Sequence, residues 1–229
     1  MVKVLFLGND TDYSNRVKTG LENAGYPLVD DQKQADLTVS AAYGQKLPPG
    51  GLNLHPSLLP KYRGATPVPR QILDGVKQSG ITIIKMTGEF DAGPIVAQKT
   101  VPVLPEDTAP DLLRRCFKTG ADLLIKILPD YLNNKITLRP QADSKTAYCR
   151  RFTKQDGFVT WEEFKRGVDE RKIRALYPWP GVWTTMPASP AGGPNGKTLK
   201  LLPKNMYQLE GKQPITMKQF LTGYGQLLA

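Results

Sequence analysis

The segment Val2-Lys3-Val4-Leu5-Phe6-Leu7-Gly8 opens the chain with an apolar run that ends in a glycine. A short apolar run bounded by a turn residue is typical of a buried strand in a parallel sheet. A helix is expected next, with Val17, Leu21 and Ala24 on one face and Gly25 at its end. Further apolar runs predict four more strands, at Leu37–Ala42, Leu52–His55, Ile81–Met86 and Ile95–Val103.

A long helix is predicted after the last of these strands. Thr108-Ala109-Pro110-Asp111 has the spacing of a capping box. The inward face of the helix would carry Leu113, Cys116, Phe117, Leu124 and Leu128. Strands that alternate with helices predict an α/β domain over residues 1–140, with a Rossmann-like, mostly parallel sheet.

The pattern changes near Arg139-Pro140. Short strand-like pieces follow, separated by turn signals at Gly157, Pro178, Pro180-Gly181 and Ser189 to Gly196. This pattern predicts a second, small β-rich domain over residues 146–229, barrel-like (OB-like), with one helix around Trp161–Leu176.

The charge of the chain is concentrated in this second region. The net charge is +10, and residues 146–229 hold 13 Lys and Arg against 6 Asp and Glu. A local basic excess is typical of a surface that binds phosphate backbones. The alternative is a basic surface that only aids solubility.

Composition excludes several classes of protein. No run approaches the ~18 consecutive apolar residues of a membrane span, and the opening run is too short for a signal peptide. Cys116 and Cys149 lie far apart and have no neighbouring histidine, which argues against a disulfide scaffold and a zinc site. We therefore expect a cytoplasmic protein without a metal. His55 is the single histidine, so any imidazole chemistry must fall to it.

Three polar residues follow or end predicted strands. Asn53 and His55 are two positions apart, so both side chains point to the same face of an extended strand. An amide donor and an imidazole on one face can hold a carbonyl and its developing oxyanion. Asp91, in Phe90-Asp91-Ala92-Gly93-Pro94, supplies a carboxylate that could orient His55 and act as a base. Each residue also has a structural interpretation, as a packed histidine or as a turn-forming Asn or Asp.

Residues 53–64 (NLHPSLLPKYRG) and 80–98 (GITIIKMTGEFDAGPIVAQ) resemble the folate-dependent formyltransferases. The resemblance implies transfer of a formyl group from 10-formyltetrahydrofolate to an amine, with Asn53, His55 and Asp91 as the catalytic trio and no metal. It also implies two folate-side loops and a nearby glycine: Tyr43, Gly44, Gln45, Lys46, Leu47; Ser57, Leu58, Leu59, Pro60; and Gly93.

The second region is similar to the barrel-like domain of methionyl-tRNA formyltransferases. The similarity lies in TKQDG at 153–157 and in IRALYPWPGVWT at 173–184. It implies a charged initiator tRNA as substrate, held through phosphate contacts that position the tRNA without reading bases. The expected cationic contacts are Arg150, Arg151, Lys154, Arg171, Lys172 and Arg174. No membrane partner is implied, and we expect a monomer.

One departure keeps other acceptors open. Only ten residues separate Gly25 from Asp36, where the tRNA enzymes carry a basic loop for the acceptor stem. A sugar-amine formyltransferase, a formyltetrahydrofolate hydrolase and a catalytically decayed tRNA-binding protein therefore remain alternatives.

Overall fold

The computed structural model describes residues 1–45, 49–142, 148–187 and 196–228. The chain divides into two compact units. The first comprises residues 1–71, 76–105 and 111–151, and the second comprises residues 72–75, 106–110 and 152–229. Tyr148 to Arg151 therefore pack with the first unit.

The first unit is built on a six-stranded sheet in the order β2-β1-β3-β4-β5-β6. Strands β2, β1, β3 and β4 are parallel, whereas β5 runs antiparallel to both β4 and β6. The strand bounds are β1 Val4–Gly8, β2 Leu28–Val29, β3 Leu37–Ala41, β4 Leu52–His55, β5 Gln78–Lys85 and β6 Ile95–Pro102. The predicted α/β class and mostly parallel sheet are confirmed.

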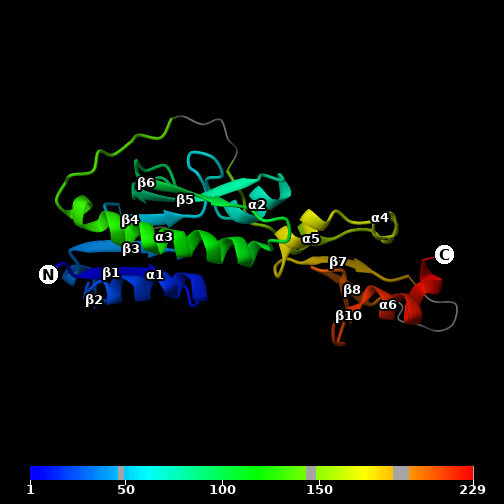
Figure 1. Ribbon diagram of the computed structural model, residues 1–229. Coiled ribbons are helices and arrows are strands. Elements are labelled where there is room, and N and C mark those ends of the chain that lie inside the picture. Colours follow the sequence, from blue (N-terminus) through cyan, green and yellow to red (C-terminus); the bar gives the residue numbers. More distant parts are fainter. Residues whose placement is uncertain (46–48, 143–147, 188–195, 229) are drawn as a thin grey trace. The chain divides into compact units, whose positions relative to one another are not determined.

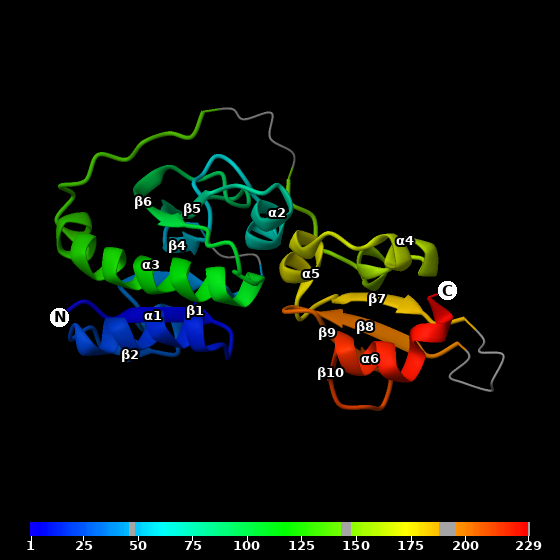
Figure 2. The same cartoon turned by 45° about the vertical axis from the view of Figure 1, so that its right-hand side comes forward.

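Helices α1 (Asp12–Asn23) and α3 (Ala109–Leu132) run beside each other across this sheet (Figures 1 and 2). Tyr13 of α1 stacks on Phe117 of α3, with ring centroids 5.3 Å apart. Gly120 lets α3 approach the sheet, since a Cβ there would come within 2.8 Å of Ile81. Of the residues predicted for the inward face of α3, only Leu113 is not fully buried; Leu112 takes that place.

A short helix that the sequence did not predict, α2 (Pro67–Leu73), follows β4 and its loop. Its buried Gln71 donates to the carbonyls of Pro56 and Pro67, at 3.0 and 3.1 Å. The hydrogen bond to Pro56 connects α2 to the residue directly after His55.

The second unit contains a four-stranded antiparallel sheet in the order β10-β9-β8-β7. A barrel-like domain was predicted here. Over the described residues, the strands form an open sheet whose outer strands are β7 and β10. Helices α4 and α5 lie along β7, and α6 lies against β9 and β10 (Figure 2). The bounds are α4 Trp161–Arg166, α5 Glu170–Leu176, β7 Val182–Thr185, β8 Thr198–Leu202, β9 Met206–Leu209, β10 Ile215–Thr216 and α6 Met217–Tyr224.

The single helix predicted around Trp161–Leu176 is wrong, because two helices occupy this stretch. Gly167 ends α4 with a φ of 96°, a left-handed conformation that favours glycine. Asp169 then caps α5 by accepting from the N–H of Arg171 at 2.8 Å. Gly167 and Asp169 therefore divide the predicted single helix into two.

Candidate active site

The imidazole of His55 lies at the end of β4 and is 5% exposed. Its Nε2 is 2.9 Å from the carbonyl oxygen of Tyr62. A carbonyl only accepts, so Nε2 carries the proton of this bond. Its Nδ1 is 3.4 Å from Oδ1 of Asp91. When the ring carries both protons, it pairs with Asp91 while it donates to Tyr62.

Asp91 reaches His55 by a route that the sequence did not predict. Because β5 is antiparallel to β4, the end of β5 at Lys85 pairs with Leu52 rather than with His55. His55 and Asp91, the two predicted catalytic positions, therefore do not follow strands that end at the same edge of the sheet. The loop between β5 and β6 turns back along β4 and places the carboxylate on the imidazole.

The Asp91 carboxylate is held on both oxygens. Oδ2 accepts from the backbone N–H of Gly64 at 2.9 Å, and Oδ1 faces His55. Burial alone would raise the pKa of Asp91, but the hydrogen bond and charge of His55, with the Gly64 N–H, outweigh it. The pKa of Asp91 is therefore lowered, and the group is an anion at neutral pH.

Asn53 lies on β4, two residues before His55, and is half-buried. Strand periodicity places its side chain on the same face of the sheet as His55. A half-buried amide on the same face as a buried imidazole can hold a carbonyl oxygen.

Comparison with known proteins assigns the family. Residues 22–128 match the formyl transferase model, and residues 151–206 match the model of the formyl transferase C-terminal domain. A Listeria monocytogenes methionyl-tRNA formyltransferase is 34% identical over 86% of this chain and 73% of its own length. A Treponema denticola methionyl-tRNA formyltransferase is 33% identical over 91% of this chain and 68% of its own length.

The chain belongs to the formyltransferase family. The predicted enzyme class, a folate-dependent N-formyltransferase, is confirmed.

Solved structures share the fold of this formyltransferase. HypX from Aquifex aeolicus, in complex with tetrahydrofolic acid, superposes with a TM-score of 0.71 at 17% identity, over 99% of this chain and 47% of that chain. A Shewanella sugar N-formyltransferase gives 0.65 at 20% identity, over 93% and 100%. The methionyl-tRNA formyltransferase from Clostridium thermocellum gives 0.66 at 13% identity, over 94% and 96%.

The loop Ser57–Pro60 of the formyltransferase is held by buried hydrogen bonds. Thr82 donates to the carbonyl of Ser57 at 2.6 Å and accepts from the N–H of Leu59 at 3.1 Å. Gln98 donates to the carbonyl of Leu59 at 2.8 Å. The loop is therefore a preformed wall beside His55, as a binding site requires.

The other predicted folate-side positions have different surroundings. Tyr43 is half-buried, Gly44 and Gln45 are exposed, and Lys46 and Leu47 lie outside the described residues. Gly93 is buried, and a Cβ there would lie 1.8 Å from the carbonyl oxygen of Lys85. Gly93 therefore permits the close approach of the two backbone segments that flank the Asp91 loop, at Lys85 and at Gly93. We call this point the neck of the loop.

The six cationic positions predicted to bind tRNA belong to both units of the chain. Arg150 and Arg151 pack with the first unit, where Arg151 donates to the carbonyl of Gly44 at 3.0 Å. In the second unit, Arg171 pairs with Asp169 at 2.7 Å, and Arg174 donates to the carbonyl of Asp107 at 2.8 Å. The remaining two also have neighbours there: Lys154 over the ring of Trp183 and Lys172 near the carbonyl of Phe158.

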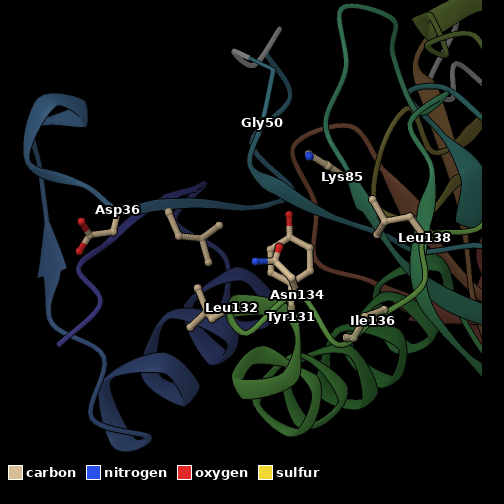
Figure 3. A pocket seen from close by; sticks show the side chains of 9 residues that line it. Asp36, Gly50, Lys85, Tyr131, Leu132, Asn134, Ile136 and Leu138 are labelled. Atoms are coloured by element: carbon tan, nitrogen blue, oxygen red, sulfur yellow. The ribbon is translucent and has the colours of Figure 1, made fainter.

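A separate surface pocket of about 290 Å³ lies between the start of β3, the end of β5 and the end of α3 (Figure 3). Asp36, Lys85, Tyr131 and Asn134 are its polar lining residues. Burial raises the pKa of Tyr131. The pocket includes none of the predicted catalytic or folate-side residues.

The described residues contain neither a candidate metal centre nor a helix that could span a membrane. No group of three or more His, Cys, Asp and Glu there is placed to hold a metal ion. None of the helices described is long and apolar enough to cross a membrane.

Sequence reasoning missed the groups that hold the pair. They are the Tyr62 carbonyl and the Gly64 N–H, which are backbone atoms, and the side chain of Gln141. Tyr62, Arg63 and Gly64 are the last residues of the segment that resembles the family, and this position could have indicated their role. Nothing in the sequence around Gln141 indicated a role for it.

Proposed function

We propose that this formyltransferase transfers the formyl group of 10-formyltetrahydrofolate to the amino group of methionyl-tRNA. The main support is that the identity to enzymes named methionyl-tRNA formyltransferase extends over most of the chain, including the second domain matched at residues 151–206. The solved relative that holds tetrahydrofolic acid supports the folate donor.

In the proposed reaction, the free amine attacks the formyl carbon, and the bond from that carbon to the folate nitrogen breaks. Asn53 and His55 donate to the formyl oxygen as it becomes an oxyanion, worth ~3–4 kcal/mol for one good donor. Asp91 orients His55 and helps move the proton lost by the amine to the leaving folate nitrogen. To reach the oxyanion, Nε2 of His55 must share or leave the Tyr62 carbonyl that it contacts here.

The residues around His55 fit a folate on two grounds. The Ser57–Pro60 loop is held by hydrogen bonds to Thr82, and Asn53 offers an amide on the His55 face. The folate supplies the formyl group, and the backbone of Tyr43 to Leu47 with the Ser57–Pro60 loop would hold its ring. Asn53, His55 and Asp91 would lie at the formyl end.

We infer that the tRNA is bound through phosphates by cationic side chains of the second unit and the segment before it. The net excess of Lys and Arg over residues 146–229 supports this interface. Arg150, Arg151, Lys154, Arg171, Lys172 and Arg174 are the proposed contacts. Arg171 contributes least, because Asp169 already neutralises it.

A sugar amine is the second candidate acceptor. The short connection between Gly25 and Asp36 favours it, since that region lacks the basic loop expected of tRNA enzymes. The Shewanella sugar N-formyltransferase has the same fold over its entire length. Hydrolysis, with water as acceptor, and tRNA binding without turnover are the remaining outcomes.

A parallel assay tests these alternatives. The full chain is mixed with 10-formyltetrahydrofolate and is given charged initiator Met-tRNA, a nucleotide-linked sugar amine, or no acceptor. We expect formyl-methionyl-tRNA to form at least ~100-fold faster than either formylated sugar or free formate, since only the correct acceptor gains from positioning. Faster sugar formylation, acceptor-independent formate release, or binding of tRNA without product would each overturn the proposal.

A further inference from the structure

The loop that carries Asp91 has a strained backbone at the catalytic position. Asp91 has a φ of 52°, in the left-handed region that non-glycine residues rarely adopt. Such a conformation persists only where surrounding contacts over-determine it. The contacts to His55 and Gly64 hold only the carboxylate oxygens of Asp91. The backbone of the loop therefore needs separate hydrogen bonds to hold it in this conformation.

Gln141 supplies that anchor. Its Nε2 donates to the carbonyl of Asp91 at 2.8 Å and to the carbonyl of Gly93 at 2.7 Å. Its Oε1 accepts from both Nε and Nη2 of Arg63, at 3.0 and 2.7 Å. A guanidinium only donates and a carbonyl only accepts, so the amide has a single orientation with both N–H groups and its oxygen satisfied.

This amide joins the two loops that meet at the imidazole. Arg63 lies between Tyr62, whose carbonyl contacts Nε2 of His55, and Gly64, whose N–H contacts Asp91. The other end of the amide holds Asp91 itself. Gln141 therefore controls the separation between the acceptor on one side of the ring and the carboxylate on the other.

The backbone that carries Gln141 is fixed as well. Arg139, two residues earlier, exchanges two backbone hydrogen bonds with Ile95 of β6, at 2.8 and 2.9 Å. Gln141 is half-buried, so the groups that form its hydrogen bonds are partly shielded from water.

We propose that Gln141 is a positioning residue for catalysis, whose amide sets the distance between Asp91 and His55. This inference rests on the proposed role of the His55–Asp91 pair in formyl transfer. The residue touches neither substrate nor the reacting atoms, and it acts through the backbone of Asp91 and the side chain of Arg63.

Two substitutions test this role in the full chain. Gln141→Met keeps the length of the side chain and removes all four hydrogen bonds. Gln141→Glu keeps an acceptor for Arg63 and removes both donors to the Asp91 loop. We expect each to lower kcat by about 10- to 100-fold, the scale of a catalytic group displaced by about 1 Å. Tetrahydrofolate affinity should change less than about twofold, because the hydrogen bonds of Gln141 go to Arg63, Asp91 and the backbone carbonyl of Gly93, and none goes to the Ser57–Pro60 loop.

The single histidine provides a readout that does not depend on activity. With histidine labelled in ¹⁵N, the only imidazole signals belong to His55. We expect both Gln141 variants to move these signals toward those of Asp91→Asn, because the carboxylate leaves the ring. Gln34→Met, on an exposed turn, is the matched control and should keep the wild-type spectrum and kcat.

Three results separate the possible failures. Wild-type kcat in both Gln141 variants, or a fall in kcat while the His55 signals stay at their wild-type positions, would overturn the positioning role. A lowered kcat in Gln141→Met together with a wild-type kcat in Gln141→Glu would assign the effect to the contact with Arg63. That result would overturn the anchoring of Asp91. If the wild-type chain formylates no acceptor, the proposed function fails, and the His55 signals still decide whether Gln141 places Asp91.

Discussion

At the residue scale, His55 is the centre of the site because its two ring nitrogens face two different acceptors. The Tyr62 carbonyl and the Asp91 carboxylate hold the ring in one orientation. A buried neutral imidazole offers one donor and one acceptor nitrogen, whereas both nitrogens of His55 face acceptors. The carboxylate of Asp91 stabilises the doubly protonated ring. In that form the ring can donate a hydrogen bond to an oxygen on which negative charge develops.

Replacement of either partner of this pair should remove most turnover. We expect His55→Ala and Asp91→Asn each to lower kcat by ~100-fold or more, the scale for loss of a positioned donor or acid–base group. Tetrahydrofolate binding should persist, because Thr82 and Gln98 hold the Ser57–Pro60 loop independently of His55 and Asp91. Steady-state formyl transfer and equilibrium folate titration measure the two effects. Near wild-type turnover in either variant would show that the assignment is wrong.

The lowered pKa of Asp91 has a consequence for stability. A carboxyl whose folded pKa is depressed stabilises the fold above its unfolded pKa of ~4, and this stability is lost as the pH falls through the lower folded pKa. We expect the wild type to exceed Asp91→Asn in stability by about 1–3 kcal/mol at pH 7, with the difference shrinking below about pH 4. Thermal unfolding of both proteins from pH 7 to pH 3 measures this. A difference that stays constant with pH would contradict it.

At the element scale, the antiparallel β5–β6 hairpin gives the site its shape. Its neck is narrow because the backbone at Gly93 approaches Lys85 more closely than any Cβ allows. The loop beyond this neck is the element that turns back to His55.

A Cβ at the neck should therefore open the hairpin. We expect Gly93→Ala to destabilise the fold by about 1–3 kcal/mol, as overpacking does, and to lower kcat because Asp91 moves. Gly88→Ala, in the same loop, meets no atom within 4 Å and is the matched control with near wild-type behaviour. Urea unfolding and formyl transfer are measured for both. Equal stability of the two variants would refute the steric role of Gly93.

At the scale of the whole molecule, most of the net positive charge lies in the second region. The 13 Lys and Arg over residues 146–229 exceed the 6 Asp and Glu there. Phosphate contacts release counterions when they form, which makes such binding sensitive to salt.

We expect tRNA affinity to fall steeply with salt, with a log–log slope of about −0.7 to −0.9 for each phosphate contact. Changing Arg150, Lys154 and Lys172 to Gln should reduce this slope. The same change at three exposed lysines of the first unit, Lys118, Lys126 and Lys135, is a control of equal charge. Binding titrations at several salt concentrations measure both sets. These contacts read no bases, so initiator and elongator Met-tRNA should be distinguished poorly. Salt-independent binding, or equal effects of the two sets, would contradict this interface.

The sequence by itself determined the α/β class, the strand at Leu52–His55 and the shared face of Asn53 and His55. These features depend on local periodicity, which is written in neighbouring residues. The antiparallel direction of β5 and the break between α4 and α5 were not predicted. Strand direction is decided by hydrogen bonds between distant segments, and the break depends on the left-handed conformation at Gly167.

Only the tertiary structure decided how the catalytic pair is held. The Tyr62 carbonyl and the Gly64 N–H are backbone groups that every residue type carries, so no sequence pattern marks them. Gln141 lies 50 positions from Asp91 and meets it only because the chain pairs with β6 first. The residues proposed to do the chemistry could be named from the sequence, whereas the groups that orient them depend on contacts that exist only in the folded chain.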